Sequence, residues 1–294
     1  MDKIINEINI TGTLVDASKV KTGMFKKGQS IGKQYVSGEV LVKCIIDGEE
    51  NIIPVSLFSS EVTQKGEHSK LFDAYCKLPS QVGQRFTFSG ANLEEHRYVG
   101  QKGEVVRTQR IRARFVNEAK ATEQDSATFR LNGYVARGLE EKKNKKGETY
   151  LFELVIGQSD YRGESAQMFY LNLPLDAIEH QNAIRKAYVP GVTVSVDGDI
   201  RYITEQREIE AEETANLFGT PMKKTVINTY RYFYIKHATQ PLPANDPNAY
   251  NMQEMQAFKE ARSAEDAELI SAAKSSGAVA DNDAPLSSKA ASLL

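Results

Sequence analysis

The sequence has no tryptophan, only two cysteines and four histidines, and no uncharged apolar run near 18 residues. The last absence excludes a membrane-spanning helix, and residues 1–10 lack the apolar core of a signal peptide. Cys44 and Cys76 are too few for a disulfide framework or a four-thiolate zinc site. We therefore expect a cytoplasmic protein that makes no contact with a membrane.

Motifs of catalysis and cofactor binding are also missing. The nearest approach to a phosphate-binding loop has three residues between Gly28 and Gly32 instead of four, and Gln34 replaces the Ser or Thr that would coordinate magnesium. No Gly-x-Ser-x-Gly or His-Glu-x-x-His pattern occurs. We predict that the protein is not an enzyme and uses no metal or cofactor, unless a site is assembled from residues without recognisable spacing.

The charge is nearly balanced overall but uneven along the chain. Residues 1–120 carry 18 Lys and Arg against 14 Asp and Glu, residues 121–240 carry 15 against 17, and residues 241–294 carry 4 against 8. With 40% apolar and 26% charged residues, the composition is that of a globular protein. A mildly basic front and an acidic rear form a charge asymmetry along the chain, although differences of this size also arise by scatter.

The chain repeats itself once. The tightest match, Gly83-x-x-Phe86-x-Phe88-x-Gly90, has the spacing of Gly191-x-x-Val194-x-Val196-x-Gly198. Two weaker matches occur in the same order, beginning at Ile8 and Phe129, and at Gly48 and Gly163. Three matches in order predict a duplication, with domains over residues 1–120 and 121–240 and a tail over 241–294.

Each copy alternates strands with one helix. The first is expected to have strands near residues 5–17, 34–47, 50–58, 84–98 and 104–117, with a helical stretch at about 60–78. The second is expected to have strands near 127–140, 148–158, 165–173, 192–210 and 224–238, with a helix near 175–188. Gly12 and Gly133 lie in the first strand of each copy, where we expect a bulge or sharp bend.

Five strands with a helix between the third and fourth are typical of the OB-fold barrel. The fold class predicted is therefore all-β, with two tandem five-stranded OB-fold barrels and a flexible, partly helical tail. Over residues 5–240 the sequence resembles a tandem OB-fold single-stranded-DNA-binding protein of the phage or bacterial replication type. For a phage-encoded chain the expected location is the host cytoplasm. A β-sandwich is the alternative, which the single helix in each copy argues against.

Basic loops recur at corresponding places in the two copies, where an OB barrel binds its ligand. Residues 18–34 contain Lys19, Lys21, Phe25, Lys26, Lys27 and Lys33. Residues 140–149 contain Lys142, Lys143, Lys145 and Lys146, offset by three glutamates. The hairpin between the fourth and fifth strands of copy one contains Arg97, Tyr98, Lys102 and Arg107. We predict phosphate contacts from these cations; solvated loop tips are the alternative.

The last strands of the two copies differ in kind. Arg110, Arg112 and Arg114 alternate with Ile111 and Phe115, and correspond to Tyr230, Tyr232 and Tyr234 in copy two. If Ile111 and Phe115 face the core, both rows face outward. We predict that the arginines contact phosphates and that the tyrosines stack on bases. The alternatives are a solvated arginine row and tyrosines packed against the other domain or the tail, and Arg231 disturbs the inward side of this register.

Two tyrosines and one apolar loop tip complete the candidate surface. Tyr35 and Tyr150 begin equivalent strands and are candidate stacking groups, although Tyr150 shares its parity with core residues. Leu217 and Phe218 lie in the loop over residues 212–224 and are expected to be exposed. This apolar tip suits gripping the strand, contacting another subunit or folding back.

The segment after residue 240 reads as a separate tail. Three prolines in residues 241–247 indicate a linker, residues 252–274 have a helix-forming composition without one apolar stripe, and the last twenty residues are typical of disorder. The tail is similar to the acidic tails of bacterial single-strand-binding proteins, which recruit replication proteins, but it lacks a dense acidic run. Competition with nucleic acid for the basic grooves, or no role, is the alternative.

The prediction is a sequence-tolerant single-stranded DNA-binding protein that coats and protects DNA in replication, recombination or repair. An OB-fold interaction scaffold, such as a phage structural component or replisome adaptor, is the second hypothesis. Single-stranded RNA is a third, since no residue here separates RNA from DNA. The oligomeric state stays open.

Overall fold

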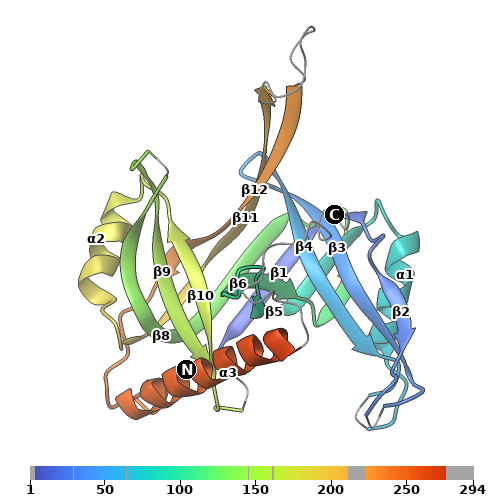
Figure 1. Ribbon diagram of the computed structural model, residues 1–294. Coiled ribbons are helices and arrows are strands. Elements are labelled where there is room, and N and C mark those ends of the chain that lie inside the picture. The colour runs from blue at the N-terminus through green and yellow to red at the C-terminus, as the bar shows by residue number, and fades with distance from the viewer. Residues whose placement is uncertain are drawn as a thin grey trace, which may run out of the picture.

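The fold is described by a computed structural model, which covers residues 4–28, 30–63, 65–144, 146–160, 162–210 and 223–275 (Figure 1). Twelve strands in this part of the chain form one continuous sheet. The all-β class and OB-type architecture are confirmed. No helix in these ranges is long and apolar enough to cross a bilayer.

The first half of the chain contains seven strands and one α-helix. In chain order they are β1 (Asn6–Asp16), β2 (Lys21–Met24), β3 (Gln34–Ile46), β4 (Glu49–Ser60), α1 (Lys70–Lys77), a 3-10 turn (Leu78–Ser80), β5 (Arg85–Val99), β6 (Val105–Arg112) and β7 (Phe115–Glu118). The predicted first basic loop thus contains the short strand β2, which pairs with β3.

The second half contains five strands and one helix, followed by the tail helix. They are β8 (Ser126–Lys143), β9 (Thr149–Ser159), β10 (Ala166–Leu173), α2 (Ile178–Ala187), β11 (Thr193–Glu210), β12 (Lys223–Ala238) and α3 (Met252–Ser275). In this half the predicted strand and helix positions agree with these bounds within a few residues. The tail helix lies within a residue of its predicted range.

The helix expected within residues 60–78 is shorter than predicted. It begins at Lys70, because the hydroxyl of Ser69 accepts a hydrogen bond from the Phe72 amide (3.3 Å) and caps the first turn. Upstream, Gly66 has a φ of +83°, which ends any helical run there. The described residues between Ser60 and Lys70 are therefore not helical, and Val62 and His68 form an isolated β-bridge there.

Each half closes its sheet in the same way. In the first half β4 pairs in parallel with β6, as Val55 with Ile111, and in the second half β10 pairs in parallel with β12, as Asn172 with Tyr234. Likewise β1 pairs antiparallel with β5, and β8 pairs antiparallel with β11. This matching topology agrees with a duplicated barrel, and the domain boundary at residue 120 stays a prediction.

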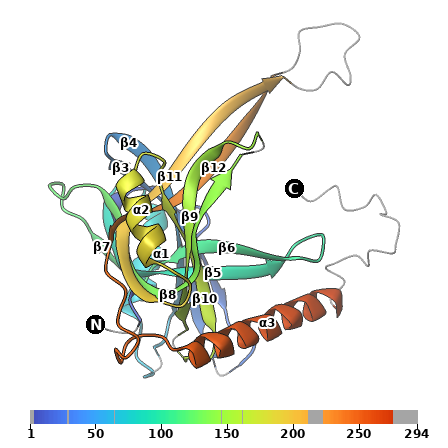
Figure 2. The ribbon, with the colours of Figure 1, turned by 90° about the vertical axis from the view of Figure 1, so that its left-hand side faces the viewer.

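The two halves are joined by backbone hydrogen bonds. β1 pairs antiparallel with β8 over six residues, from Asn6 opposite Leu131 to Thr11 opposite Ser126. Most buried apolar residues of the two halves form one contiguous cluster, and a smaller second cluster joins Tyr134 and Ala166 to Tyr250 and Phe258. The β5–β6 hairpin and the longer β11–β12 hairpin project from this body, and α3 extends beneath them on the same side (Figure 2).

The two first-strand glycines allow neighbouring strands to approach closely. A Cβ at Gly12 would lie 2.3 Å from the carbonyl oxygen of Lys43, and one at Gly133 would lie 2.4 Å from that of Gly157. Any side chain at either position would displace the adjacent strand. The expected bulges lie just beyond the two glycines, where the strand register shifts between Leu14 and Asp16 and between Val135 and Arg137.

Candidate nucleic-acid interface

Each half presents an outer surface formed by three strands. The first face is the outer side of β3, β4 and β6, and the second face is the outer side of β9, β10 and β12. On β6 the Ile111 side chain is buried in the core, so Arg110 and Arg112, its neighbours in sequence, point to the first face. On β12 Phe233 and Ile235 are buried, so Tyr230, Tyr232 and Tyr234 point to the second face.

The predicted register fails at Phe115. Its side chain is 59% exposed instead of buried, because the chain leaves the β6 ladder after Arg112 and starts a new strand, β7. Phe115 there pairs with Ser89 of β5 and lies against Gly90. Arg114 sits in this break and is exposed, so it does not continue the row of Arg110 and Arg112.

Three aromatic rings gather on the first face. The ring centres of Phe25 and Tyr35 are 4.9 Å apart. Those of Tyr35 and Phe58 are 6.0 Å apart, and the two rings are inclined at 25°. The guanidinium of Arg112 is 5.5 Å from the centre of the Phe58 ring, a cation–π geometry. This Phe58 cluster (Phe25, Tyr35 and Phe58) combines flat apolar surface with a cation, which suits an unpaired base and its phosphate.

The arginines of the first face share one carboxylate. Arg110 lies 3.1 Å from Glu94 and Arg112 lies 3.2 Å from it, while both arginines stay partly exposed. Pairs exposed to this degree contribute little to stability. A phosphate could therefore replace Glu94 at either arginine at small cost.

The three tyrosines of β12 form a ladder on the second face. The rings of Tyr230 and Tyr232 are 6.3 Å apart at 4°, and those of Tyr232 and Tyr234 are 5.2 Å apart at 11°. All three side chains are half-buried. Burial raises the pKa of Tyr234, so its hydroxyl is neutral at physiological pH. Parallel, partly accessible rings can accept bases on their flat sides.

A hollow of about 320 Å³ opens beside the ladder. Its lining includes Lys142, Tyr150, Glu153, Tyr230 and Tyr232. Tyr150 is 48% exposed, which places it at the surface instead of in the core. Lys142 lies 2.8 Å from Glu153, so the hollow combines aromatic surface with both signs of charge.

The strand β11, which pairs with the ladder strand β12, is fixed to the first half. The guanidinium of Arg201, which is 7% exposed, donates to the Ile46 carbonyl (2.8 Å) and pairs with Asp47 in the β3–β4 turn. Asn51 accepts a hydrogen bond from the Tyr202 amide (3.0 Å). Arg231 is exposed, and its guanidinium lies 5.7 Å from the centre of the buried Tyr202 ring, so this cation of β12 reaches solvent and does not enter the core.

The predicted lysines fall into two groups. In the first loop Lys19 forms an ion pair with Glu39 (2.8 Å). The other lysines of this loop have exposed side chains: Lys21, Lys26, Lys27 and Lys33. In the second loop Lys143 pairs with Glu141 at 3.6 Å, Lys146 is exposed and Lys145 lies outside the described residues. The first loop therefore offers more available positive charge than the second.

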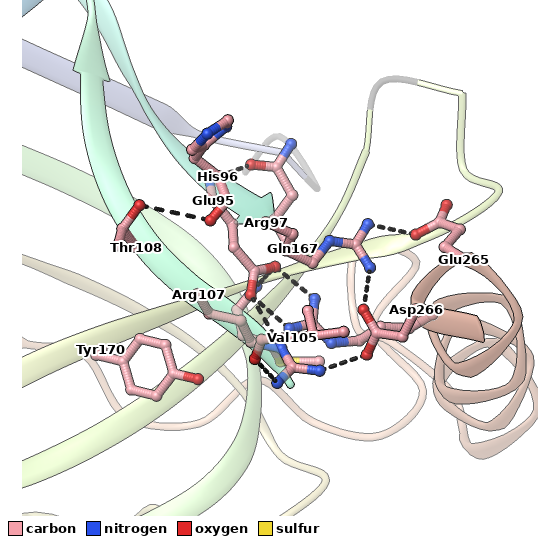
Figure 3. Close-up of polar contacts among 12 residues, drawn as sticks. Glu95, His96, Arg97, Val105, Arg107, Thr108, Gln167, Tyr170, Glu265 and Asp266 are labelled. Carbon is pink, nitrogen blue, oxygen red and sulfur yellow. Dashed lines mark hydrogen bonds and ion pairs between the residues drawn. The ribbon is translucent and has the colours of Figure 1, made fainter. Parts of the chain in front are cut away.

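The cations of the β5–β6 hairpin face α3. Arg97 pairs with Glu265 and with Asp266 (3.1 Å), and Arg107 pairs with Asp266 (Figure 3). Lys102 at the turn is exposed, and Tyr98 is 44% exposed. Of the hairpin cations predicted to contact phosphates, Arg97 and Arg107 are thus already occupied by carboxylates.

The two faces adjoin along β6 and β10. The Gln109 side chain accepts a hydrogen bond from the Tyr170 amide and donates to the Tyr170 carbonyl (3.4 Å). Gln109 directly precedes Arg110 of the first face. Tyr170 lies two residues before Asn172, which pairs with Tyr234 of the second face. Figure 1 shows β9 and β10 on one side and β3 and β4 on the other, with β6 between them.

Comparison with known proteins identifies the family. A family model described as YorF matches residues 4–276. The chain belongs to the YorF family. No curated protein sequence matches it.

Two solved structures resemble this YorF chain. The wild-type single-stranded DNA binding protein from Thermus aquaticus has a TM-score of 0.52 at 12% identity, covering 83% of this chain and 96% of that chain. A deletion mutant of the same protein has a TM-score of 0.51 at 13% identity, covering 83% and 98%. At this identity the likeness establishes the fold of the YorF chain.

Several residues of the two faces were not foreseen from the sequence. Phe58, 39% exposed on β4, has a detectable signal, since it alternates with the buried Leu57 and Val55. The Arg201 contacts and the α3 carboxylates have none, because they join segments far apart in the chain. The predicted tip at Leu217 and Phe218 lies outside the described residues.

Proposed function

We propose that this protein binds single-stranded DNA without strong sequence preference and protects it during replication, recombination or repair. The observation that carries the proposal is the ladder of Tyr230, Tyr232 and Tyr234, three nearly parallel rings on the binding side of an OB-type barrel. Stacking on such rings is worth roughly 1–3 kcal/mol per base and tolerates every base.

The first face supplies the complementary contacts. The Phe58 cluster offers a second stacking surface, and Arg110, Arg112 and the first-loop lysines neutralise phosphates. Each neutralised phosphate releases counterions from a single strand, so binding weakens with salt at a slope of about −0.7 per contact. The fold likeness to a single-stranded DNA binding protein supports the same assignment.

Titration of fluorescent oligothymidylate with the protein at several salt concentrations tests the proposal. We expect saturable binding, a linear decrease of log affinity with log salt, and weak competition by duplex DNA of equal length. Equal affinity for duplex and single strand, or affinity that ignores salt, would refute it. Oligouridylate in the same assay separates DNA from RNA, because only the 2′-hydroxyl and the base methyl group differ.

A protein-interaction scaffold is the second candidate, favoured by the ion-paired state of Arg97 and Arg107. A scaffold function requires that Arg97 and Arg107 stabilise the fold through their ion pairs and do not bind phosphate. Retention of a stable protein partner, with no retention on immobilised single strands, would favour this function. Recruitment of replication proteins through the tail belongs to the first proposal and is tested by the same capture with residues 276–294 removed.

A further inference from the structure

The first half of α3 is anchored to the second half of the chain. The Phe258 ring packs against the rings of Tyr134 and Tyr250, at centroid distances of 6.4 and 6.1 Å. The Tyr250 hydroxyl lies 3.2 Å from the Ser159 hydroxyl, and the Tyr250 amide donates to the Thr193 hydroxyl (2.8 Å). Apolar packing and buried hydrogen bonds therefore fix this end of the helix.

The middle of α3 reaches across to the β5–β6 hairpin of the first half (Figure 3). Arg262 forms a two-pronged pair with Glu95, whose side chain is 1% exposed. One turn further on, Asp266 pairs with both Arg97 and Arg107. A single helix thus joins an element of the first half to the body of the second.

The same side chains complete the open edge of β10. β12 pairs with β10 only at Asn172 among the described residues, which leaves the preceding backbone groups on that edge without a strand partner. Side chains supply the missing partners: Glu95 accepts from the Met168 amide (3.2 Å), Arg262 donates to the Ala166 carbonyl (3.0 Å), and Gln109 bonds to Tyr170. The hairpin is therefore held directly against β10.

The Arg262–Glu95 pair is buried, as is typical of a contact that stays formed in the folded protein. Burial disfavours the charge of Arg262, but its hydrogen bonds to Glu95 and the nearby carboxylates of Glu95 and Asp266 raise its pKa above the ordinary value. Removing one partner of a buried pair leaves an uncompensated charge, which is costly. A cover that DNA displaces easily would instead be expected to use exposed pairs.

We propose that α3 is a clasp that holds the β5–β6 hairpin against β10, so that the first and second faces form one continuous path for a long single strand. This inference rests on the proposed function. A strand that reaches both faces gains affinity because its second contact is intramolecular, and that gain requires the faces to be held in register. A short strand that occupies one face needs no clasp.

The test compares two lengths of oligothymidylate on full-length variants. Lengths of about 5 and about 25 nucleotides bracket the occupancy of one face and of both. Arg262→Gln breaks the buried pair, and Asp266→Asn removes the carboxylate shared by two arginines. We expect roughly three- to tenfold weaker binding of the long strand, with unchanged binding of the short one. Glu260→Gln, which removes the same charge from an exposed position of α3, should match wild type at both lengths.

Hydrogen exchange reads the clasp independently of DNA. The Met168 and Tyr170 amides should be protected in wild type and should exchange faster in Asp266→Asn, a substitution milder than Arg262→Gln if the latter fails to fold. Faster exchange with an unchanged ratio of long- to short-strand affinity would overturn the proposal. Tighter binding by Asp266→Asn at both lengths would also overturn it, because α3 would then be competing with DNA for the hairpin.

Failure of the proposed function has a different signature. In that case wild type binds neither length, whereas failure of the clasp leaves wild-type binding and its length dependence intact in every variant.

Discussion

Replacement of Tyr232 by Ala is the most direct test of the tyrosine ladder. The Tyr232 ring is the middle one, 6.3 Å from Tyr230 and 5.2 Å from Tyr234, so its loss leaves the outer rings without a common neighbour. Loss of one stacked base costs roughly 1–3 kcal/mol. At 1.4 kcal/mol per tenfold change, this corresponds to about 5- to 150-fold weaker binding.

The assay uses the protein's own emission together with anisotropy of labelled oligothymidylate. Because the sequence has no tryptophan, tyrosine emission is not masked, and the difference in quenching between wild type and Tyr232→Ala isolates the contribution of the Tyr232 ring among the 13 tyrosines. We expect DNA to quench wild type more than Tyr232→Ala, and Tyr232→Phe to bind within about twofold of wild type because it keeps the stacking surface. Wild-type affinity in a folded Tyr232→Ala protein would refute the assignment of the ladder to base stacking.

Three other predictions test the first face and the fold. Phe58→Ala should weaken DNA binding by about fivefold or more, whereas Phe115→Ala, which removes an even more exposed ring on β7, should have no effect; equal losses would contradict the location of the face. Arg112→Ala should reduce the salt slope by about 0.7, as measured by titration at several salt concentrations. Burial raises the pKa of Cys44 to about 12, so below that pH its thiolate is scarce, and iodoacetamide at pH 8.5 should label only the exposed Cys76 in the folded protein; mass spectrometry showing both labelled would contradict the described core.

The sequence indicated the strands well because their signals are local. Alternation of apolar residues located the strands of both halves, and the paired glycines Gly12 and Gly133 marked the close approach of neighbouring strands. The break after Arg112 was missed, since residues 110–115 alternate as one uninterrupted strand. Only the pairing of β7 with β5 shows that the chain changes its partner there, and pairing partners leave no mark on the sequence.

The candidate site was less accessible from sequence for a related reason. The spacing of Tyr230, Tyr232 and Tyr234 at every second residue places their side chains on one side of the sheet, so the ladder was predictable. The roles of Arg97 and Arg107 were not, because the carboxylates that hold them lie about 160 residues further along the chain. Positive charge on a hairpin is visible in the sequence, whereas its neutralisation by a distant helix is a property of the folded chain.

The completed edge of β10 has a consequence for the solubility of shortened chains. A strand whose amides and carbonyls are satisfied by side chains of other elements becomes a template for foreign strands once those elements leave. A chain ending before α3 would lose Arg262 at Ala166 and loosen Glu95 at Met168, exposing an apolar strand along one border. Such a fragment is expected to self-associate by edge-to-edge pairing of its β-strands, so α3 also protects the protein against aggregation.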